Sequence, residues 1–372
     1  MYLKSLIVNN FKNYTEANLE FSEKINCFVG DNGEGKTNLL DAIYYLSFCK
    51  SYFNLVDMQN IKHEEDFFAI HGNYIRKDEY QDMVSCIQKR NQRKVFRINK
   101  KEYERLADHI GLFPLVMISP YDRDLINEGS EIRRKYIDSV ISQFDRIYLD
   151  DLINYNKALQ QRNALLKQFA ESNRFESASL EMWNVHLQKH GENIYQKRKV
   201  FLEEFMPLFQ HYFAFISGGK EKVEISYLSQ MNDNDMEGLL KDNLQRDRAL
   251  QYTSVGIHKD DLEFMMDGFA VKKFGSQGQQ KSFFIALKLA QFEYTKNIKG
   301  FKPILLFDDI FDKLDNTRVE QLIKLVADQN FKQVFITDTQ TERIVNVFEK
   351  INIPHKIFKV EKGRATEMEQ NV

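Results

Sequence analysis

The sequence predicts an α/β fold in which both ends of the chain contribute to one parallel sheet and a mainly helical part is inserted between them. Three observations predict this fold. A glycine-rich loop joins an apolar run to a helical pattern within residues 25–46. A second apolar run ends in two acids, the first of which lies 272 residues after the lysine of that loop. Helical periodicity dominates residues 132–216 of the intervening chain, as expected for a helical insertion.

The composition is that of an ordinary globular protein. Its 372 residues suffice for one large domain or two to three smaller ones, and 43% apolar with 28% charged residues can bury a core. A net charge of −2 excludes a protein that is basic throughout, so nucleic-acid binding would need a local basic face. Three scattered cysteines without a CxxC pair favour a reducing compartment. Since neither a signal-peptide pattern nor an apolar run of about 18 residues is present, we expect a cytoplasmic protein that makes no membrane contact.

The first element along the chain is a strand, loop and helix of the kind that binds phosphate. The apolar run Ile25–Val29 predicts a buried strand, and apolar residues at helix spacing begin at Leu39. Between them, residues 30–37 form the pattern G-x4-G-K-T in the context that this motif requires. Glycines let successive backbone N–H groups surround phosphate oxygens, and the helix N-terminus adds partial positive charge. The residues expected to bind a nucleotide here are Gly30, Asn32, Gly33, Gly35, Lys36, Thr37 and Asn38.

Two side chains of this loop have defined roles in phosphoryl transfer. Lys36 would reach the β- and γ-phosphates of ATP, and Thr37 would place its hydroxyl on Mg²⁺. A glycine turn that arises by chance is the alternative, but the strand before it and the helix after it make that alternative rare. We therefore expect ATP and Mg²⁺ as cofactors.

The second element is an apolar strand that ends in two acids. Residues 304–307 form a continuous apolar run, typical of a parallel strand covered on both faces. A carboxylate at the tip of such a strand, beside a phosphate-binding loop, holds Mg²⁺, so we expect Asp308 to act on the metal side. Asp309 would orient or deprotonate the attacking water, which makes Lys36, Asp308 and Asp309 the expected catalytic residues. The stretch KQVFITDT at 332–339 predicts another buried strand, and its polar end, formed by Thr337, Asp338 and Thr339, would lie near the γ-phosphate.

The chain between these two elements predicts a small antiparallel sheet followed by long helices. Short alternating runs within residues 67–98 favour the sheet. Helical spacing then covers 132–168 and 176–216, which predicts two long helices that pair antiparallel. A Gly-Gly pair at 218–219 would end the second helix, and Pro207 would kink or break it. Heptads are not sustained, so no extended coiled-coil arm is expected.

A polar turn opens a further helix in the stretch GSQGQQKSFFIALKLAQ at 275–291. Small polar residues before an amphipathic helix either cap the helix or present its N-terminus to an anion, and the stretch by itself supports both interpretations.

Together these motifs are similar to the heads of ABC-type ATPases, in which a signature motif at the start of a helix closes the ATP site of a second subunit. Four stretches narrow the resemblance to the RecF family of bacterial DNA replication and repair proteins. They are NNFKNY before the glycine loop, SPYDRDLINEGSEIRRKYIDSVISQFDRIYLDDLINYNKALQQRNALLK at 119–167, GIHKDDLEF at 256–264 and the stretch from 275. The resemblance covers nearly the whole chain. It implies an ATPase lobe formed by residues 1–118 and 250–372, and a helical lobe formed by residues 119–249.

The resemblance also implies a function. Family members resemble the heads of SMC and Rad50 proteins without their long arms. They bind DNA, favour junctions of single and double strands, dimerise with ATP and help to load RecA together with RecO and RecR. The resemblance therefore implies an ATP-dependent DNA-binding protein of recombinational gap repair and replication restart, an ATP-dependent homodimer, and a weak, DNA-stimulated ATPase activity.

The family motifs fall on definite positions of this chain. The glycine-loop residues match the Walker A motif, and the family's other motifs match Ser276, Gly278 and Gln279 (signature), Asp308 and Asp309 (Walker B) and Leu314 and Asp315 (D-loop).

The chain departs from the family pattern at three places. Asp309 stands where many ABC proteins have Glu, and its shorter side chain fits slow turnover. Asp338 lies near the position of the usual switch histidine. In the 256–264 stretch, Ile257 and Lys259 stand where Pro and Arg are expected.

The segment 89–105 is the best candidate for a DNA-binding surface. It holds eight Lys or Arg and two Glu, a net charge of +6, and such cations contact phosphates in a salt-sensitive way. A solvated sheet edge, where lysines block aggregation, explains the same charges. A second candidate is the pair at 133–134, which a salt bridge to nearby acids explains equally well. The residues expected to contact DNA are Arg93, Lys94, Arg97, Lys100 and Lys101.

Two other classes of ATPase share some of these features. An SMC-like or Rad50-like ATPase of another DNA-maintenance pathway is the main alternative, but such proteins need long heptad arms, and Rad50 needs a CxxC hook. A small-molecule P-loop kinase would not need the signature stretch. Stimulation of ATP hydrolysis by DNA distinguishes the DNA-bound class from the kinase.

Overall fold

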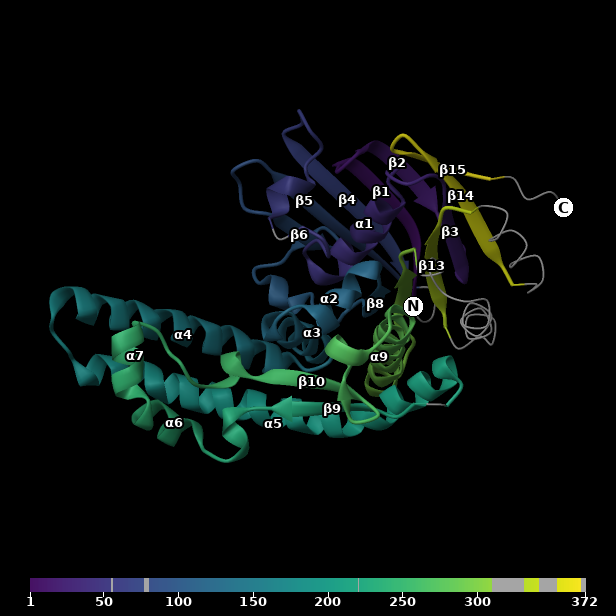
Figure 1. Ribbon diagram of the computed structural model, residues 1–372. Helices are drawn as coiled ribbons and strands as arrows, with labels where there is room; N and C mark the ends of the chain where they lie inside the picture. The colour runs from purple at the N-terminus through teal and green to yellow at the C-terminus, as the bar shows by residue number, and fades with distance from the viewer. Residues whose placement is uncertain (55, 77–79, 220, 310–330, 341–352, 369–372) are drawn as a thin grey trace. The chain divides into compact units, whose positions relative to one another are not determined.

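The computed structural model of the chain describes residues 1–54, 56–76, 80–219, 221–309, 331–340 and 353–368 (Figure 1). The chain divides into two compact units: unit 1 comprises Met1–Asp122 and Leu287–Val372, and unit 2 comprises Arg123–Ala286. Strands dominate unit 1 and helices dominate unit 2, so the expected α/β fold with a mainly helical insertion is confirmed. The lobe boundaries expected at 118/119 and 249/250 stay predictions.

A six-stranded sheet of unit 1 brings the two ends of the chain together. Its strands are β3 (Ile25–Val29), β8 (Leu115–Ile118), β12 (Ile304–Phe307), β13 (Gln333–Asp338), β14 (His355–Glu361) and β15 (Arg364–Glu367). The order is β15-β14-β3-β13-β12-β8, and every neighbouring pair is parallel except β14 with β15. Strands β3, β8, β12 and β13 are completely buried, as expected for parallel strands covered on both faces. The three apolar runs predicted as strands are therefore confirmed.

The second sheet of unit 1 is antiparallel throughout. Its strands are β1 (Tyr2–Phe11), β2 (Tyr14–Glu20), β4 (Phe67–Ile75), β5 (Gln81–Lys89), β6 (Val95–Ile98) and β7 (Lys101–Glu102). Their order is β2-β1-β4-β5-β6-β7. The antiparallel sheet predicted within residues 67–98 is confirmed, and it is extended by two N-terminal strands that the sequence pattern did not reveal.

Helix α1 (Lys36–Phe48) lies between these two sheets. It contacts β1, β4 and β5 of the antiparallel sheet and β8 and β13 of the parallel one. Every residue from Leu39 to Phe48 is buried, because a helix with a sheet on either side has no face left for solvent. This packing fixes the N-terminus of α1 at the carboxyl end of β3, where the glycine loop joins them.

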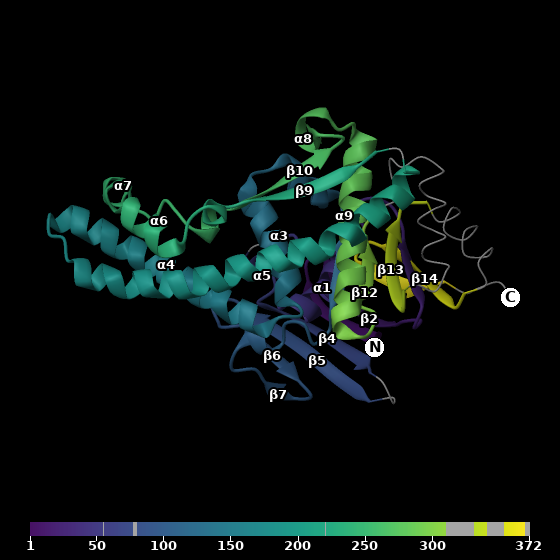
Figure 2. The same ribbon diagram turned by 90° about the horizontal axis from the view of Figure 1, so that it is seen from below.

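Unit 2 is built on two long helices that pack side by side (Figures 1 and 2). Its helices are α2 (Asp124–Asn127), α3 (Ser130–Ser142), α4 (Arg146–Ser172), α5 (Ser177–Ser217), α6 (Met236–Asp242), α7 (Leu244–Leu250) and α8 (Val271–Phe274). A short loop at 173–176 joins α4 to α5, so the two helices are antiparallel, as predicted. The predicted helix at 132–168 is two helices, because Asp145 caps α4 by accepting a hydrogen bond from the Tyr148 N–H at 2.8 Å.

The prediction that Pro207 could break the helix is wrong. The proline lies inside α5 and does not break it, although the helix does end at Gly218, in the left-handed conformation, as expected. Phe205 and Phe209, on either side of the proline, are almost fully buried. Their packing opposes the loss of one backbone hydrogen bond, so tertiary contacts outweigh the local preference.

Three strands and one connecting helix complete the described chain. In unit 2, β9 (Val223–Leu228), β10 (Asp261–Met266) and β11 (Phe269–Ala270) form an antiparallel sheet in the order β11-β10-β9. Helix α9 (Gln277–Lys299) crosses from unit 2 into unit 1 between Ala286 and Leu287. Within the described ranges, none of the helices combines the length and the apolar character that crossing a membrane requires.

Candidate nucleotide-binding site

The glycine loop between β3 and α1 adopts a conformation that requires its glycines. Gly33 and Gly35 have φ of 84° and 116°, in the left-handed region that side chains disfavour. At Gly30, a Cβ atom would lie 2.2 Å from the carbonyl oxygen of Val360 on β14. The loop therefore has the backbone conformation and the close packing typical of a phosphate-binding loop.

Two asparagines tie the start of β2 to this loop. Asn13 donates through Nδ2 to the carbonyl oxygen of Glu34 at 2.8 Å and accepts from Nδ2 of Asn38 at 2.7 Å. Asn32 and Gly33, at the top of the loop, are exposed. Asn38 thus lies on the first turn of α1 as an anchor of the loop, while Asn32 stays accessible to a ligand.

Lys36 is a buried cation with neutral partners. The residue is 7% exposed, and its Nζ donates to the carbonyl oxygens of Gly30 and Asp31, both at 2.8 Å. Burial lowers the pKa of Lys36, while the carboxylates of Asp309 and Asp308 oppose that change. Because charge-assisted bonds to anions are stronger than bonds to neutral carbonyls, phosphate oxygens would bind this ammonium better than its present partners do.

Asp308 receives three hydroxyl hydrogen bonds at the carboxyl edge of the parallel sheet. Oδ1 accepts from Thr37 at 2.8 Å and from Thr337 at 2.9 Å, and Oδ2 accepts from Ser119 at 3.3 Å. The residue is 3% exposed, and this burial raises the pKa of Asp308, although the hydrogen bonds from Thr37 and Thr337 lower it. The structure thus brings Thr37 and Asp308, 271 residues apart, into direct contact.

These oxygen ligands fit Mg²⁺. That ion is usually bound by one or two carboxylates together with phosphate oxygens and water, rather than by a cage made of protein alone. Among the described residues, no group of three or more His, Cys, Asp or Glu is arranged to hold a metal ion. A hydroxyl from Thr37 and a carboxylate from Asp308 would therefore hold Mg²⁺ only jointly with a phosphate-bearing ligand.

Two further acids lie at the same edge. Asp309 has a left-handed backbone, with φ of 46°, and its N–H donates to the hydroxyl of Thr337 at 2.8 Å. Such backbone strain in a non-glycine residue is concentrated at functional sites. Asp338, at the end of β13, is buried; its carbonyl oxygen accepts from the Gly30 N–H at 3.3 Å, and its Oδ1 accepts from the Gln340 N–H at 2.7 Å.

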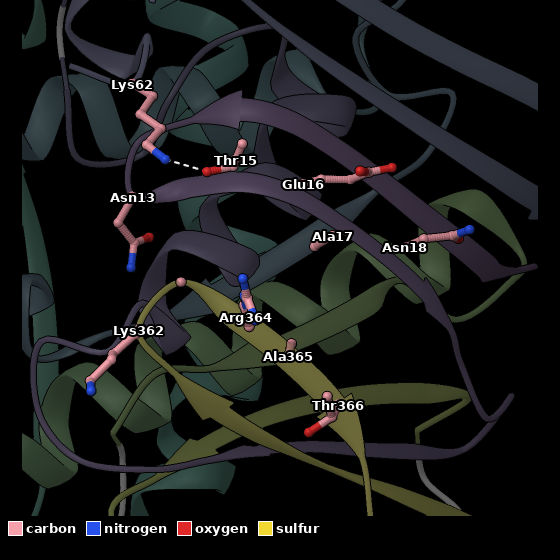
Figure 3. A pocket seen from close by; sticks show the side chains of 11 residues that line it. Asn13, Thr15, Glu16, Ala17, Asn18, Lys62, Lys362, Arg364, Ala365 and Thr366 are labelled. Carbon is pink, nitrogen blue, oxygen red and sulfur yellow. Dashed lines mark hydrogen bonds between the residues drawn. The ribbon is translucent and has the colours of Figure 1, made fainter. Parts of the chain in front are cut away.

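A cavity of about 610 Å³ adjoins the glycine loop in unit 1 (Figure 3). Asn13 and Thr15 line it from one side, and Lys362 and Arg364 of the β14–β15 hairpin line it from the other. The hairpin is held against the loop because the Gly363 N–H donates to the carbonyl oxygen of Glu34 at 3.2 Å. The cavity wall carries Lys62, Lys362 and Arg364 together with Glu16.

The expected signature residues lie in unit 2, at the start of α9. Ser276 Oγ accepts from the Gln279 N–H at 3.3 Å, and Gln279 Oε1 accepts from the Ser276 N–H at 2.8 Å. This is a reciprocal capping box, so the helix-capping interpretation of the turn is confirmed, while the anion-binding interpretation remains a proposal. Gln279 also donates to Glu221 at 2.9 Å, and Gly278 is half-buried. The expected D-loop residues, Leu314 and Asp315, lie outside the described residues.

The basic segment 89–105 forms part of the β5–β6–β7 edge of the antiparallel sheet. Arg93 donates to the carbonyl oxygen of Glu104 at 3.0 Å, and Arg97 forms an ion pair with Glu102 at 3.5 Å. Lys100 and Lys101 are exposed. These four side chains are at the surface or half-buried, so all four stay candidates for phosphate contacts.

Lys94 does not fit the same expectation. Its Nζ donates to the Tyr45 hydroxyl at 3.0 Å, to the Cys49 carbonyl oxygen at 2.6 Å and to Asp57 Oδ2 at 2.6 Å, and its side chain is 10% exposed. With its three donors engaged inside unit 1, Lys94 is a structural cation, and the expectation that it contacts DNA is corrected.

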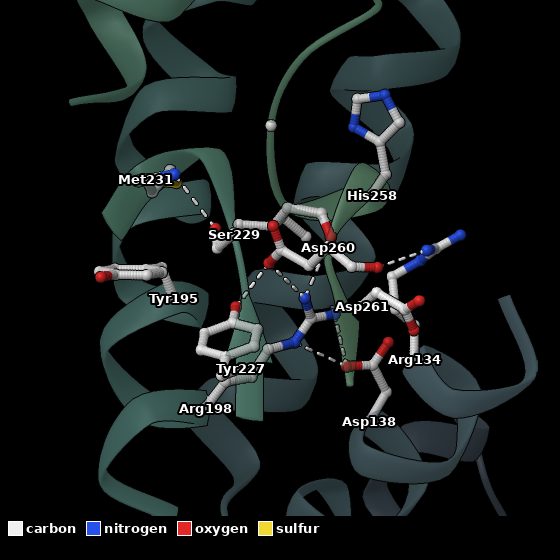
Figure 4. Close-up of polar contacts among 12 residues, drawn as sticks. Arg134, Asp138, Tyr195, Arg198, Tyr227, Ser229, Met231, His258, Asp260 and Asp261 are labelled. Carbon is white, nitrogen blue, oxygen red and sulfur yellow. Dashed lines mark hydrogen bonds and ion pairs between the residues drawn. The ribbon is translucent and has the colours of Figure 1, made fainter. Parts of the chain in front are cut away.

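A charged centre of unit 2 surrounds Arg198 on α5 (Figure 4). The residue is 1% exposed, and its guanidinium forms ion pairs with Asp138 of α3 at 2.8 Å and with Asp260 at 3.0 Å. It also donates to the Tyr148 hydroxyl and the Ile257 carbonyl oxygen. Burial lowers the pKa of Arg198, but the surrounding acidic groups raise it well above its usual value. This centre fixes the 256–261 stretch to three helices of unit 2.

The other charged residues of that stretch also have partners. Asp261 accepts a bidentate pair of bonds from Arg133 at 2.6 and 3.0 Å, which supports the salt-bridge explanation for Arg133. Arg134 donates to the Asp260 carbonyl oxygen at 2.6 Å. Both ring nitrogens of His258 are engaged, by the Tyr155 hydroxyl and by the Thr253 carbonyl oxygen, and burial lowers the pKa of His258 to about 4.

Sequence reasoning missed the hydroxyl of Ser119, and it placed Thr337 at a polar strand end of the site without naming its partner. Ser119 follows β8 and Thr337 lies in β13, and both bind Asp308. A usable signal existed, because the carboxyl ends of parallel strands meet at one edge of a sheet. The four-residue run at 115–118, followed at once by a serine, was too short to be recognised as a strand of that sheet.

Comparisons with known proteins agree with the geometry of the site. The family model described as RecF/RecN/SMC N terminal domain matches residues 2–366. The chain is 53% identical over 358 residues to the DNA replication and repair protein RecF of Flavobacterium johnsoniae, covering 96% of this chain and 99% of that protein. It is 50% identical over 371 residues to the RecF protein of Phocaeicola vulgatus, covering 100% and 99%.

Solved structures give the same result for the fold. A structure described as the recombination mediator protein RecF-ATP in the RecFOR pathway superposes with a TM-score of 0.90 at 31% identity, covering 99% of this chain and 98% of that one. The Smc head domain of Pyrococcus furiosus, with a TM-score of 0.59 at 17% identity, covers 99% and 96% and shares the fold. The ABC-type head fold expected from the motifs is therefore confirmed, and the chain belongs to the RecF family of DNA replication and repair proteins.

Proposed function

We propose that this chain is an ATP-dependent DNA-binding protein of recombinational gap repair and replication restart. The observation that carries the proposal is the contact between Thr37 and Asp308 beside the buried Lys36. It places an ammonium, a hydroxyl and a carboxylate around the mouth of a glycine loop. Membership of the RecF family, and a relative whose structure is described with ATP, support ATP as the ligand.

The residues at this edge have different roles in ATP hydrolysis. Lys36 binds the β- and γ-phosphates, and the N–H groups of the glycine loop orient them. Thr37 and Asp308 hold Mg²⁺, which neutralises charge on the phosphates when it is bound. Asp309 orients the attacking water or accepts its proton. Since an aspartate is one methylene shorter than glutamate, it reaches that water less well, and the proposed turnover is slow.

ATP also controls pairing in this proposal. Ser276 and the N-terminus of α9 bind the γ-phosphate held by a second copy of the chain, because helix N-termini favour anions. ADP lacks that phosphate, so hydrolysis removes the ligand that joins the two copies. The pair is therefore a homodimer that forms with ATP and separates with ADP.

DNA binds the dimer through phosphate contacts. Arg93, Arg97, Lys100 and Lys101 supply the cations, without Lys94, whose ammonium is already bound. The preferred substrate is a junction of single- and double-stranded DNA, DNA accelerates the slow hydrolysis, and the protein acts with RecO and RecR to load RecA. The RecFOR pathway in the description of the solved relative supports these partners.

Binding to gapped and to fully duplex DNA, each with ATPγS or ADP, tests the proposal. We expect gapped DNA to bind more tightly with ATPγS, and binding to weaken steeply with salt. Charge reversal of Arg93 and Arg97 should abolish most of the salt dependence, whereas reversal of Lys4, outside the basic segment, should not. Equal binding to both DNAs with both nucleotides would contradict the proposed function.

Sedimentation tests the pairing step. Wild-type chain should dimerise with ATPγS and stay monomeric with ADP, and Ser276→Arg should block the dimer while single-site ATP binding persists. A dimer equally populated with both nucleotides would reject the switch.

A further inference from the structure

Two phenylalanines form an exposed apolar patch just before the signature residues. Phe274, at the end of α8, is 68% exposed, and Phe269, on β11, is 59% exposed. Their rings meet edge to face, with centroids 5.5 Å apart. No large apolar side chain in the described ranges of the chain is more exposed than Phe274. Exposed apolar groups scattered singly are ordinary, but paired aromatic rings left in water mark a contact surface.

The loop between the patch and Ser276 is rigidly held. Gly275 donates to the Val271 carbonyl oxygen at 3.0 Å, and a Cβ atom at Gly275 would lie 2.8 Å from that same oxygen. Gln280, on the first turn of α9, donates to Ser276 O at 2.9 Å through its N–H and to Val271 O at 3.4 Å through Nε2. The position of Phe274 relative to Ser276 is therefore set by these bonds.

The length of the chain between Phe274 and Ser276 limits how far apart these two residues can lie. Consecutive Cα atoms are about 3.8 Å apart, so the Cα atoms of Phe274 and Ser276 are at most about 7.6 Å apart. An arrangement that places Ser276 on the phosphate of a second copy therefore also holds the Cα atom of Phe274 near the surface of that copy.

We propose that Phe269 and Phe274 form an apolar anchor that docks on a second copy of this chain beside its glycine loop. The inference rests on the proposed function, since it takes the pairing through Ser276 as given, and it names the surface that stabilises the pair. Aromatic side chains that become fully desolvated are typical anchors of such interfaces.

Charge around the patch favours the same partner. Lys272 and Lys273, between the two rings in sequence, are exposed, and neither forms an ion pair with a described residue. The glycine loop of the second copy carries the exposed acid Asp31 and, in the proposal, a triphosphate. The cationic rim of the patch thus complements Asp31 and the triphosphate at that loop, which favours association and orients it.

The test compares dimerisation of two variants of the full chain. Phe269→Ser combined with Phe274→Ser should raise the dissociation constant of the ATPγS-bound dimer at least about tenfold, with single-site nucleotide binding unchanged. Ile147→Ser is the matched control, because Ile147 of α4 is 66% exposed in the same unit; it should dimerise as wild type does. A double variant that dimerises like wild type overturns the inference.

Photo-crosslinking reports the contact directly. Cys27, Cys49 and Cys86 are all buried, so a benzophenone maleimide should label a Phe274→Cys variant at the introduced thiol. Irradiation with ATPγS should give a product of twice the mass of the chain, and with ADP it should not. Absence of that product overturns the inference.

The outcomes keep the two proposals distinguishable. Wild-type chain that stays monomeric with ATPγS contradicts the pairing proposed above, and with it the anchor. Wild-type chain that dimerises with ATPγS, together with a double variant that dimerises equally well, rejects the apolar anchor alone.

Discussion

Lys36 in unit 1 and Arg198 in unit 2 are both buried cations, but their partners differ in kind. Lys36 donates to two backbone carbonyl oxygens, whereas Arg198 is paired with the carboxylates of Asp138 and Asp260. Among the described residues, the carboxylate of Asp308 likewise accepts from three hydroxyls. A buried charge with neutral partners costs stability unless a ligand completes it, while a charge paired within the fold needs none. The difference separates a centre prepared for a ligand from a centre that holds the fold.

Removal of Arg198 should have the largest effect on stability. Arg198→Met leaves the buried Asp260 and the half-buried Asp138 without their cation, and losing one partner of a buried pair costs about 3–5 kcal/mol. Urea unfolding followed by far-UV circular dichroism measures the loss. Arg134→Met is the control, because Arg134 donates a single bond to a carbonyl oxygen; it should cost no more than about 1 kcal/mol. Equal losses for the two variants would break the comparison.

Removal of Lys36 should weaken ATP binding strongly and change the stability of the fold little. Lys36→Met should weaken ATP binding by about 100-fold, since it removes a charge-assisted contact with the phosphates. The free energy of unfolding without nucleotide should change by less than about 1 kcal/mol, because the lost partners are neutral carbonyls. Isothermal titration calorimetry and urea unfolding of the same sample measure the two quantities. Strong destabilisation with intact ATP binding would assign Lys36 a structural role.

Asp308 should link ATP binding to pH through Mg²⁺. Because burial raises the pKa of Asp308, its carboxyl takes up a proton at a higher pH than an exposed aspartate does. Mg²⁺-dependent binding of ATP should therefore weaken as the pH falls towards that raised pKa. Asp308→Asn should need at least about tenfold more Mg²⁺ at pH 7.5 and lose this acid dependence. A variant with the wild-type pH profile would exclude Asp308 from the metal site.

The pH dependence of stability that His258 contributes tests the comparison in unit 2. Its pKa of about 4 in the fold lies below the value of about 6.5 for an unfolded histidine. The stability contributed by the neutral ring is thus fully present above pH 6.5 and is lost as the pH falls towards 4. Its share of the slope is about 1.4 kcal/mol per pH unit, and His258→Gln should remove it from urea-unfolding data. His63→Gln, at a side chain that is 97% exposed, should leave the slope unchanged.

The centre around Lys36 and Asp308 was predictable from the sequence to a larger extent than the centre around Arg198. The pattern G-x4-G-K-T and the acids after 304–307 are local signals, so they predicted the loop, its neighbouring buried strands and the joint role of Thr37 and Asp308 at one metal site. Ser119 was not predicted as a residue of the site because the strand before it is only four residues long. Arg198 and its neighbours Asp138, Tyr148, Tyr227 and Asp260 come from five separate segments. No spacing along the sequence predicts that these residues lie together.

Two wrong expectations have the same physical origin. Pro207 was expected to kink or break a helix, but α5 is not broken there, and buried phenylalanines pack on either side of the proline. Lys94 was expected to contact DNA because its neighbours in sequence are basic, but the fold turns its ammonium towards Asp57. In both cases a local preference was overruled by a tertiary contact.

Amide hydrogen exchange with and without Mg²⁺-ATP tests most directly whether unit 1 holds the ligand-dependent centre and unit 2 the self-sufficient one. The account predicts a gain in protection for peptides covering the glycine loop at 30–38 and the strand ends at 304–309. It predicts no change for peptides covering Asp138, Arg198 and the 256–261 stretch. Exchange that is unchanged at the glycine loop, or a gain of equal size around Arg198, would contradict it.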